Sequence, residues 1–192
     1  MAKYGAKYIQ FAPFSATSPD ESTEAFPKYG DPVNLGALNK LTDNPTLNEA
    51  KAYGDNATQE HAVEFKECPI DIEVTELPIA AAQVVLGNET NEDNDQHFKS
   101  EDNAPYGGLA FYCNKLINNV KKYQGIYYPK VKAQVQGEEY NTKGDSISFA
   151  NDKLHFLAVT AKNGEWKVKS ALLDSESAAK AWVDGKVKKT AG

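Results

Sequence analysis

The chain has 192 residues, 41% of them hydrophobic and 25% charged, with a net charge of −6 at pH 7. That length suits one domain with a substantial core, and the composition excludes an intrinsically disordered chain. No apolar run approaches the roughly 18 residues needed to cross a bilayer, and the N-terminal residues lack the apolar core of a secretory signal. We therefore expect the protein to stay in the cytosol or to leave it without secretion.

Charge is divided along the chain. Residues 60–102 carry a net charge of −10, residues 103–192 carry +6, and all 21 basic residues are lysines. The absence of arginine argues against base readout and phosphate clamping, because both favour the planar guanidinium group. We expect no sequence-specific binding to nucleic acid. Blocks of like charge are also common on solvated faces.

The N-terminal third combines a strand with a long loop. Residues 6–14 are rich in strand formers and predict a first strand that ends at Pro13. The prolines and glycines of residues 13–37 predict a loop that is either a binding arm or disordered, because loops of this length are uncommon in compact domains. Short strands are expected over residues 39–47 and 49–54.

Residues 62–77 alternate between apolar and charged side chains, a period that is typical of a half-buried strand. Glu64, Asp71 and Glu73 lie on its charged face. Asp71 and Glu73 are candidates for a general acid and base. A solvated strand face explains them better, because the rest of the chain supplies no nucleophile or cleft signature.

Residues 77–87, "LPIAAAQVVLG", predict a short helix with Pro78 in its first turn and Gly87 at its C-terminal cap. Residues 88–103 follow as a polar, acidic loop. This loop lacks the glycine and the glutamate that an EF-hand needs at fixed positions, so we expect no calcium site there.

From Tyr106 onward the sequence is mostly strand. Strands are expected over residues 106–113, 120–128, 130–136, 145–149, 154–161 and 165–172. Asn163 and Gly164 predict a hairpin between the last two, because both residues tolerate positive φ. Pro129 cannot donate to a sheet ladder, so two strands are expected to meet there at a sheet edge or corner.

Residues 175–185 predict a second helix, with Ser175 as its N-cap and Gly185 at its C′ position. The stripe expected to pack against a sheet consists of Ala178, Ala181 and Trp182. The residues that follow are expected to be a loose tail.

Motifs for catalysis or ion binding do not emerge from the sequence. The three histidines have no metal-ligand spacing, and residues 140–146 lack the first glycine of a phosphate-binding loop. Cys68 and Cys113 are expected to be buried and unpaired. We therefore expect neither enzyme activity nor a cofactor or metal.

Several stretches of the second half resemble a known family. They are "NAPYGGLAFYCNKL", "KKYQGIYYPKVKAQVQGEEYNTKGDSISF", "NGEWKV" and "DSESAAKAWVDGKV", and they look like the major tail protein family of long, non-contractile-tailed bacteriophages. The resemblance covers residues 104–187 and is most specific in "YYPKVK", "TKGDSISF" and "SAAKAWVDGK". It is weaker over residues 38–57 and 77–87, and residues 13–37 and 88–103 match poorly.

The resemblance implies a mainly β fold: a tail-tube-type β-sandwich or barrel with one or two short flanking α-helices and long loops. It implies one domain over residues 1–187 and a C-terminal tail at 188–192. The function implied is that of a structural virion protein, assembled in the host cytoplasm, whose hexameric rings stack into the tail tube for genome delivery. Its partners would be copies of itself, the tape-measure protein and passing DNA in the lumen, and tail terminator and distal tail proteins at the ends. Neither catalytic residues nor a membrane are implied.

Placed in such a tube, the face of Glu64, Asp71 and Glu73 is expected to line the lumen, because a negative wall repels phosphates. The acidic middle and the basic C-terminal half are expected to meet across subunits, and the loops at 13–37 and 88–103 to reach an adjacent ring. The expected subunit interface consists of Tyr127, Tyr128, Pro129, Lys130 and Lys132.

Three alternatives remain at the level of sequence. The same fold could serve as the inner tube of a contractile tail or of a secretion system. A carbohydrate-binding β-sandwich would expose a tryptophan, for which Trp166 is the candidate. A hydrolase would hold Asp71 and Glu73 in a shared pocket.

Overall fold

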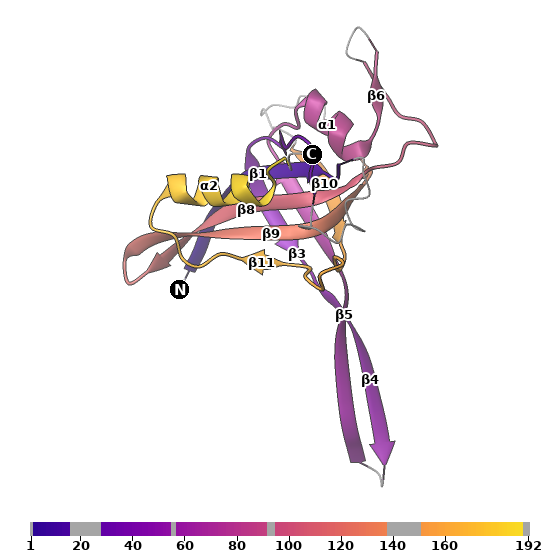
Figure 1. Cartoon of the computed structure of the whole chain (residues 1–192), viewed down its shortest axis with the longest axis vertical. Coiled ribbons are helices and arrows are strands. Elements are labelled where there is room, and N and C mark those ends of the chain that lie inside the picture. The colour runs from indigo at the N-terminus through magenta and orange to yellow at the C-terminus, as the bar shows by residue number, and fades with distance from the viewer. Residues whose placement is uncertain (1, 16–27, 55–56, 92–94, 138–150, 190–192) are drawn as a thin grey trace, which may run out of the picture.

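The computed structural model shows a mainly β protein, as predicted, and describes residues 2–15, 28–54, 57–91, 95–137 and 151–189. One antiparallel sheet curls into a half-barrel that carries two short helices and a long two-stranded arm (Figure 1). The elements are β1 (Ala2–Pro13), β2 (Val33–Asn34), β3 (Leu38–Asp43), β4 (Thr46–Gly54), β5 (Ala57–Val74), α1 (Ile79–Leu86), β6 (Glu89–Thr90), β7 (Gln96–His97), β8 (Tyr106–Ile117), β9 (Val120–Gln134), β10 (Asp152–Ala158), β11 (Val168–Lys169) and α2 (Glu176–Lys186).

The strands of the half-barrel follow the order β2-β1-β8-β9-β10-β5-β3, and β11 adds to the edge of β9. The inner face of this sheet carries the main core, which includes Phe11, Ile72, Leu109, Tyr128 and Phe156. Helix α1 contributes Ala81 and Val85 to the same core. The second half of β5 belongs to the sheet, whereas its first half pairs with β4 alone and forms the arm.

A second, smaller core lies on the outer face of β1, β8 and β9, where α2 covers the sheet (Figure 1). Tyrosines of the strands pack there against Ala179 and Val183 of the helix. Gly125 on β9 lets Trp182 pack flat against the strand, because a Cβ at that position would lie 2.1 Å from Cε3 of the indole. The helix is thus fitted to one part of the sheet.

Helix α1 begins and ends as predicted. Pro78 is its N-cap residue, and Gly87 is left-handed, with a φ of 71° and its N–H donating to the Gln83 carbonyl at 2.8 Å. This arrangement satisfies a carbonyl that the helix end would leave without a partner. Asn88, which follows, is buried.

Helix α2 agrees with its predicted start but not with its predicted end or stripe. The Ser175 hydroxyl accepts the Ala178 N–H at 3.1 Å, as an N-cap should. Gly185 lies inside the helix. The buried stripe is Ala179 and Val183, one position later than expected, and Val187 continues it beyond the helix. Alanine fits on either face of the helix, so Val183 and Val187 decide which face is buried.

Strand β9 runs unbroken through Pro129, which corrects the expectation of two strands meeting there. Pro129 and Lys130 together face the single Gly108 of β8, so the strand contains a bulge. The bulge keeps both Tyr128 and Val131 on the core side although they are three positions apart. A proline is tolerated at this position because a bulged residue needs no ladder N–H.

The turn at Asn163 and Gly164 forms, but it does not make the predicted hairpin. Strands β10 and β11 both pair with β9, one after the other along its edge, and the predicted strand 165–172 shortens to Val168–Lys169. The two-residue hairpin loop is instead Asn118–Asn119 between β8 and β9, with φ of 49° and 63°. Positive φ at both positions is the type I′ geometry that matches strand twist.

Other predictions have mixed outcomes. Cys68 and Cys113 are buried thiols, and neither forms a disulfide, as expected. The loop at 88–103 contains the short β6–β7 hairpin. The tail is not loose as far as Lys189, whose ammonium lies 2.7 Å from the Asp31 carboxylate. The predicted strand 145–149, the phosphate-loop-like stretch 140–146 and the last three residues lie outside the described part of the chain.

Candidate assembly surfaces

The two tyrosines expected at a subunit interface are buried on opposite faces of β9. Tyr128 lies in the main core and donates to Asp43 Oδ2 at 2.6 Å. Tyr127 lies under α2, with its hydroxyl 2.5 Å from that of Tyr29. Tyr29 donates its one hydroxyl proton to the Pro129 carbonyl at 2.7 Å, so Tyr127 is the donor in the tyrosine pair.

Burial raises the pKa of Tyr29, Tyr127 and Tyr128 well above the ordinary tyrosine value, so all three remain neutral donors. Pro129 is buried beside them. The three predicted interface residues Tyr127, Tyr128 and Pro129 are therefore committed to the interior of their own subunit, and their side chains are not available to a neighbour.

Lys130 and Lys132 are the part of the predicted interface that reaches solvent. Their ammonium groups lie 5.0 and 5.3 Å from the centre of the Tyr106 ring, and Lys132 also donates to Asn103 Oδ1 at 2.7 Å. Both are half-buried. Contact of these two lysines with a neighbouring subunit stays a prediction.

The three carboxylates of β5 share one side of the strand. A bulge near Lys66 places Phe65 and Cys68 on the core side although they are three positions apart. Because neighbouring residues of a strand point to opposite faces, Glu64 lies on the same outward side as Asp71 and Glu73. A position of this face in a lumen stays a prediction.

Basic groups accompany two of these carboxylates. His155 Nδ1 lies 2.7 Å from Asp71 Oδ1, and the Lys40 ammonium lies 3.8 Å from Glu73 Oε1, with Lys153 opposite Glu73 on β10. The face around Asp71 and Glu73 is therefore of mixed charge. These basic groups make the face less negative than the carboxylates of β5 alone would make it.

Asp71 and Glu73 do share a shallow hollow, of about 370 Å³, as the hydrolase alternative requires. Their side chains are 53% and 34% exposed, so water solvates both carboxylates. A general acid at neutral pH needs a raised pKa, which usually comes from burial. The hollow therefore resembles an ion-paired surface more than a catalytic cleft.

The arm formed by β4 and the first half of β5 extends from the lower end of the body (Figure 1). At its root Phe65 stacks on Trp166, with ring centroids 4.3 Å apart and planes 10° from parallel. Leu47, which pairs with Phe65 across the arm, is 51% exposed, and Val63, two residues further from the body than Phe65, is 46% exposed. Phe65 covers one face of the Trp166 ring, so only the other face could stack on a sugar, as the carbohydrate-binding alternative requires.

Sequence reasoning treated the two sides of the arm as separate strands. The polar, glycine-containing stretch 53–57 between two alternating segments was the available signal for a hairpin. Its length and its departure from the body could not be inferred, because they depend on where β5 leaves the sheet.

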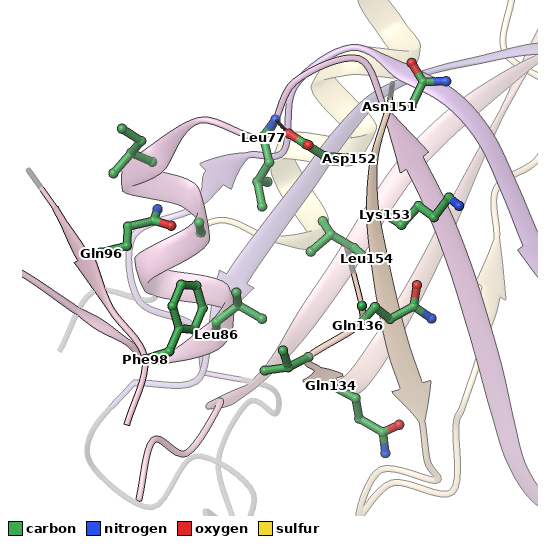
Figure 2. A pocket seen from close by; sticks show the side chains of 14 residues that line it. Leu77, Leu86, Gln96, Phe98, Gln134, Gln136, Asn151, Asp152, Lys153 and Leu154 are labelled. Atoms are coloured by element: carbon green, nitrogen blue, oxygen red, sulfur yellow. Dashed lines mark hydrogen bonds between the residues drawn. The ribbon is translucent and has the colours of Figure 1, made fainter. Parts of the chain in front are cut away.

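A second apolar surface lies at the other end of the molecule. Figure 2 shows a pocket of about 370 Å³ between α1, the segment after β7 and the ends of β9 and β10. Phe98 faces Leu86 across it, and Val135 borders it. Phe98 is 55% and Val135 70% exposed, so this surface is open to a partner.

Neither ion-binding clusters nor membrane spans add to these surfaces. Within the described ranges, no three His, Cys, Asp or Glu residues are grouped to hold a metal ion. None of the helices in the same ranges is long and apolar enough to cross a membrane.

No protein-family model and no curated protein matches the sequence.

Proposed function

We propose that the chain is a self-assembling structural subunit of a bacteriophage tail tube. The observation that carries the proposal is the β4–β5 arm, which takes apolar side chains away from the body and leaves Leu47 and Val63 in solvent. A surface of this kind needs a second molecule to cover it.

The arm is a weak structure when it stands alone. A two-stranded ribbon is marginally stable in water because neither a further strand nor a helix packs against it and buries its side chains. Among the described residues β4 pairs only with β5, so its outer edge also offers free backbone groups. Contact with another subunit would supply both the apolar cover and the missing pairing.

The curled sheet and the sequence resemblance favour a tube over other assemblies. A sheet that is already bent into a half-barrel can join equivalent sheets around a closed ring, which is the usual result of repeating one contact with rotational symmetry. Residues 104–187, which the resemblance to major tail proteins covers, include β8, β9, β10, β11 and α2. The inner tube of a contractile tail or secretion system is the nearest alternative.

Assembly of the purified protein tests the proposal. We expect rings or tubes in negative-stain electron microscopy and a concentration-dependent rise in sedimentation coefficient. A matched variant replaces residues 49–63 with Asn-Gly, which closes a two-residue hairpin on the retained root of the arm. It is expected to remain monomeric and to melt as the unaltered protein does. An unaltered protein that stays monomeric at high concentration would contradict the proposal.

A further inference from the structure

The pocket between α1 and β7 continues into a second hollow. This neighbour, of about 520 Å³, shares Leu86, Phe98, Gln134 and Val135 with the first. The two together form one groove, which we call the α1 groove. It runs from Leu77 before α1 to Lys132 on β9.

A buried amide lies in the wall of the α1 groove. Asn88 is only 6% exposed, and neither its Oδ1 nor its Nδ2 has a hydrogen-bond partner within the described residues. A buried amide without partners destabilises the fold, so such groups are rare unless water or another molecule pairs with them. An amide offers one acceptor and two donors, which complement the N–H and C=O of a peptide backbone. The groove thus combines apolar walls with a group suited to an extended chain.

We propose that the α1 groove receives the β4–β5 arm of a second copy of this chain. This assignment rests on the proposed self-assembly and names the two surfaces that meet. The apolar side chains Leu47 and Val63 of the arm would cover Phe98 and Val135 of the groove, and Asn88 would pair with the backbone of the incoming ribbon.

The positions of the two surfaces suit a head-to-tail contact. The arm leaves the body at one end of its long axis, and α1 lies at the other end (Figure 1). An arm therefore cannot reach the groove of its own subunit, whereas copies placed in line bring the arm of one to the groove of the next. A contact between two different surfaces repeats indefinitely along an axis or closes into a ring.

The charges of the two surfaces are complementary. Residues 46–67 carry five acidic residues and two lysines. The groove is lined by Lys99, Lys132 and Lys153 and by two carboxylates, Asp102 and Asp152. Each carboxylate already accepts a backbone N–H at 2.7 Å, from Lys99 and Leu77 respectively. Because the Lys99 ammonium already lies 2.5 Å from the Glu89 carboxylate, Lys132 and Lys153 are the groove lysines that would attract an acidic arm.

Three matched Val→Asp variants test the contact. Val63→Asp changes the arm, Val135→Asp changes the groove, and Val120→Asp changes an equally exposed valine at the β8–β9 turn, outside both surfaces. We expect the first two to raise the concentration at which assembly begins by at least tenfold and the third to leave it unchanged. Circular dichroism melting curves should coincide for all three, since each side chain is exposed.

Disulfide trapping tests the pairing directly. In the double variant Leu47→Cys, Val135→Cys one thiol lies on the arm and the other borders the groove, so oxidation across the proposed contact joins different subunits and gives a ladder of multimers on a non-reducing gel. Leu47→Cys with Val120→Cys is the control and should give no ladder. The native Cys68 and Cys113 are buried and do not compete.

The two proposals fail differently. If the unaltered protein assembles but Val135→Asp assembles equally well and the double variant gives no ladder, the groove assignment is overturned and the proposed function stands. If the unaltered protein does not assemble at any concentration, the proposed function fails, and the groove assignment fails with it.

Discussion

The body and the arm cover their apolar side chains in different ways. In the body, both faces of the central strands are covered: the inner face by the main core and the outer face by α2. In the arm, Phe65 is covered by Trp166 at the root, but Leu47 and Val63 are not covered beyond it. The central sheet therefore has a core on each face within one subunit, whereas the arm is suited to a contact between molecules.

This difference separates effects on stability from effects on assembly. Changes in the buried core of the body should lower the free energy of unfolding, and assembly should fall only as a consequence. Changes in the exposed part of the arm should leave unfolding unaltered and act on assembly alone. The following predictions test that separation.

The largest effect is expected for Phe156→Ala in the main core. Phe156 is fully buried and packs on Phe11, with ring centroids 5.7 Å apart. Its loss leaves a cavity and should lower the free energy of unfolding by about 3–5 kcal/mol. Val63→Ala in the arm should change it by less than about 0.5 kcal/mol. Urea unfolding followed by circular dichroism measures both, and equal losses would contradict the separation of body and arm.

A smaller loss is expected for Gly125→Ala beneath α2. The new methyl group would lie 2.1 Å from Cε3 of Trp182, so the helix or the strand has to move. Overpacking of this kind costs about 1–3 kcal/mol. In the double variant with Trp182→Ala the cost of the added methyl group should largely vanish. Additive losses in the double-mutant cycle would show that the two positions do not clash.

Asp43 should make the body sensitive to acid. Burial raises the pKa of its carboxyl group, but hydrogen bonds from Lys167 and Tyr128 outweigh burial and hold the pKa below its ordinary value. A carboxyl group whose pKa is lower in the folded state stabilises the fold at pH values above its unfolded-state pKa of about 3.9. This stability is lost as the pH falls through the folded-state pKa.

Asp43→Asn should remove this part of the pH dependence and lower stability at pH 7 by about 1–2 kcal/mol. Thermal unfolding between pH 7 and pH 3 measures both quantities. Asp95→Asn, at an exposed position, is the control and should leave the curve unchanged. An Asp43→Asn curve parallel to that of the unaltered protein would show that Asp43 has the same pKa in both states.

Salt should have the smallest effect, and on assembly only. The Debye length falls from about 8 Å at physiological ionic strength to about 3 Å at 1 M salt, so attraction between acidic and basic surfaces of different subunits is screened. We expect the concentration for assembly to rise severalfold, while the unfolding midpoint changes little. Light scattering across a salt series measures the first quantity. Assembly that does not change with salt concentration would show that electrostatic attraction does not contribute to the contact.

Local patterns determined much of the secondary structure. The alternation of β5, the Pro78–Gly87 boundaries of α1 and the Ser175 cap of α2 follow from backbone preferences and the periodicity of side chains, which act within a few residues. Alternation also places Asp71 and Glu73 on one side of the strand. These features need no knowledge of the remainder of the chain. Glu64 was predicted on the same side, but it lies there only because of the bulge near Lys66, which depends on the pairing with β4.

Features that depend on the alignment of distant strands could not be inferred in the same way. The bulge at Pro129 exists because β8 and β9 differ by one residue there, and the Asn163–Gly164 turn makes no hairpin because β10 and β11 both pair with β9. The buried stripe of α2 was likewise decided by packing, because Val183 and Val187 lie in the second core with the tyrosines of the sheet. Each outcome depends on which partner a segment meets in three dimensions.

The candidate surfaces show the same division. The sequence by itself determined a mainly β chain with two short helices, the division of charge along the chain and the alternation of apolar and charged residues in β5. Only the tertiary structure buried Tyr127 and Tyr128 in their own subunit and placed an apolar arm and an apolar groove at opposite ends. The physical reason is that burial is set by packing between segments far apart in the chain, whereas propensity and periodicity act along it.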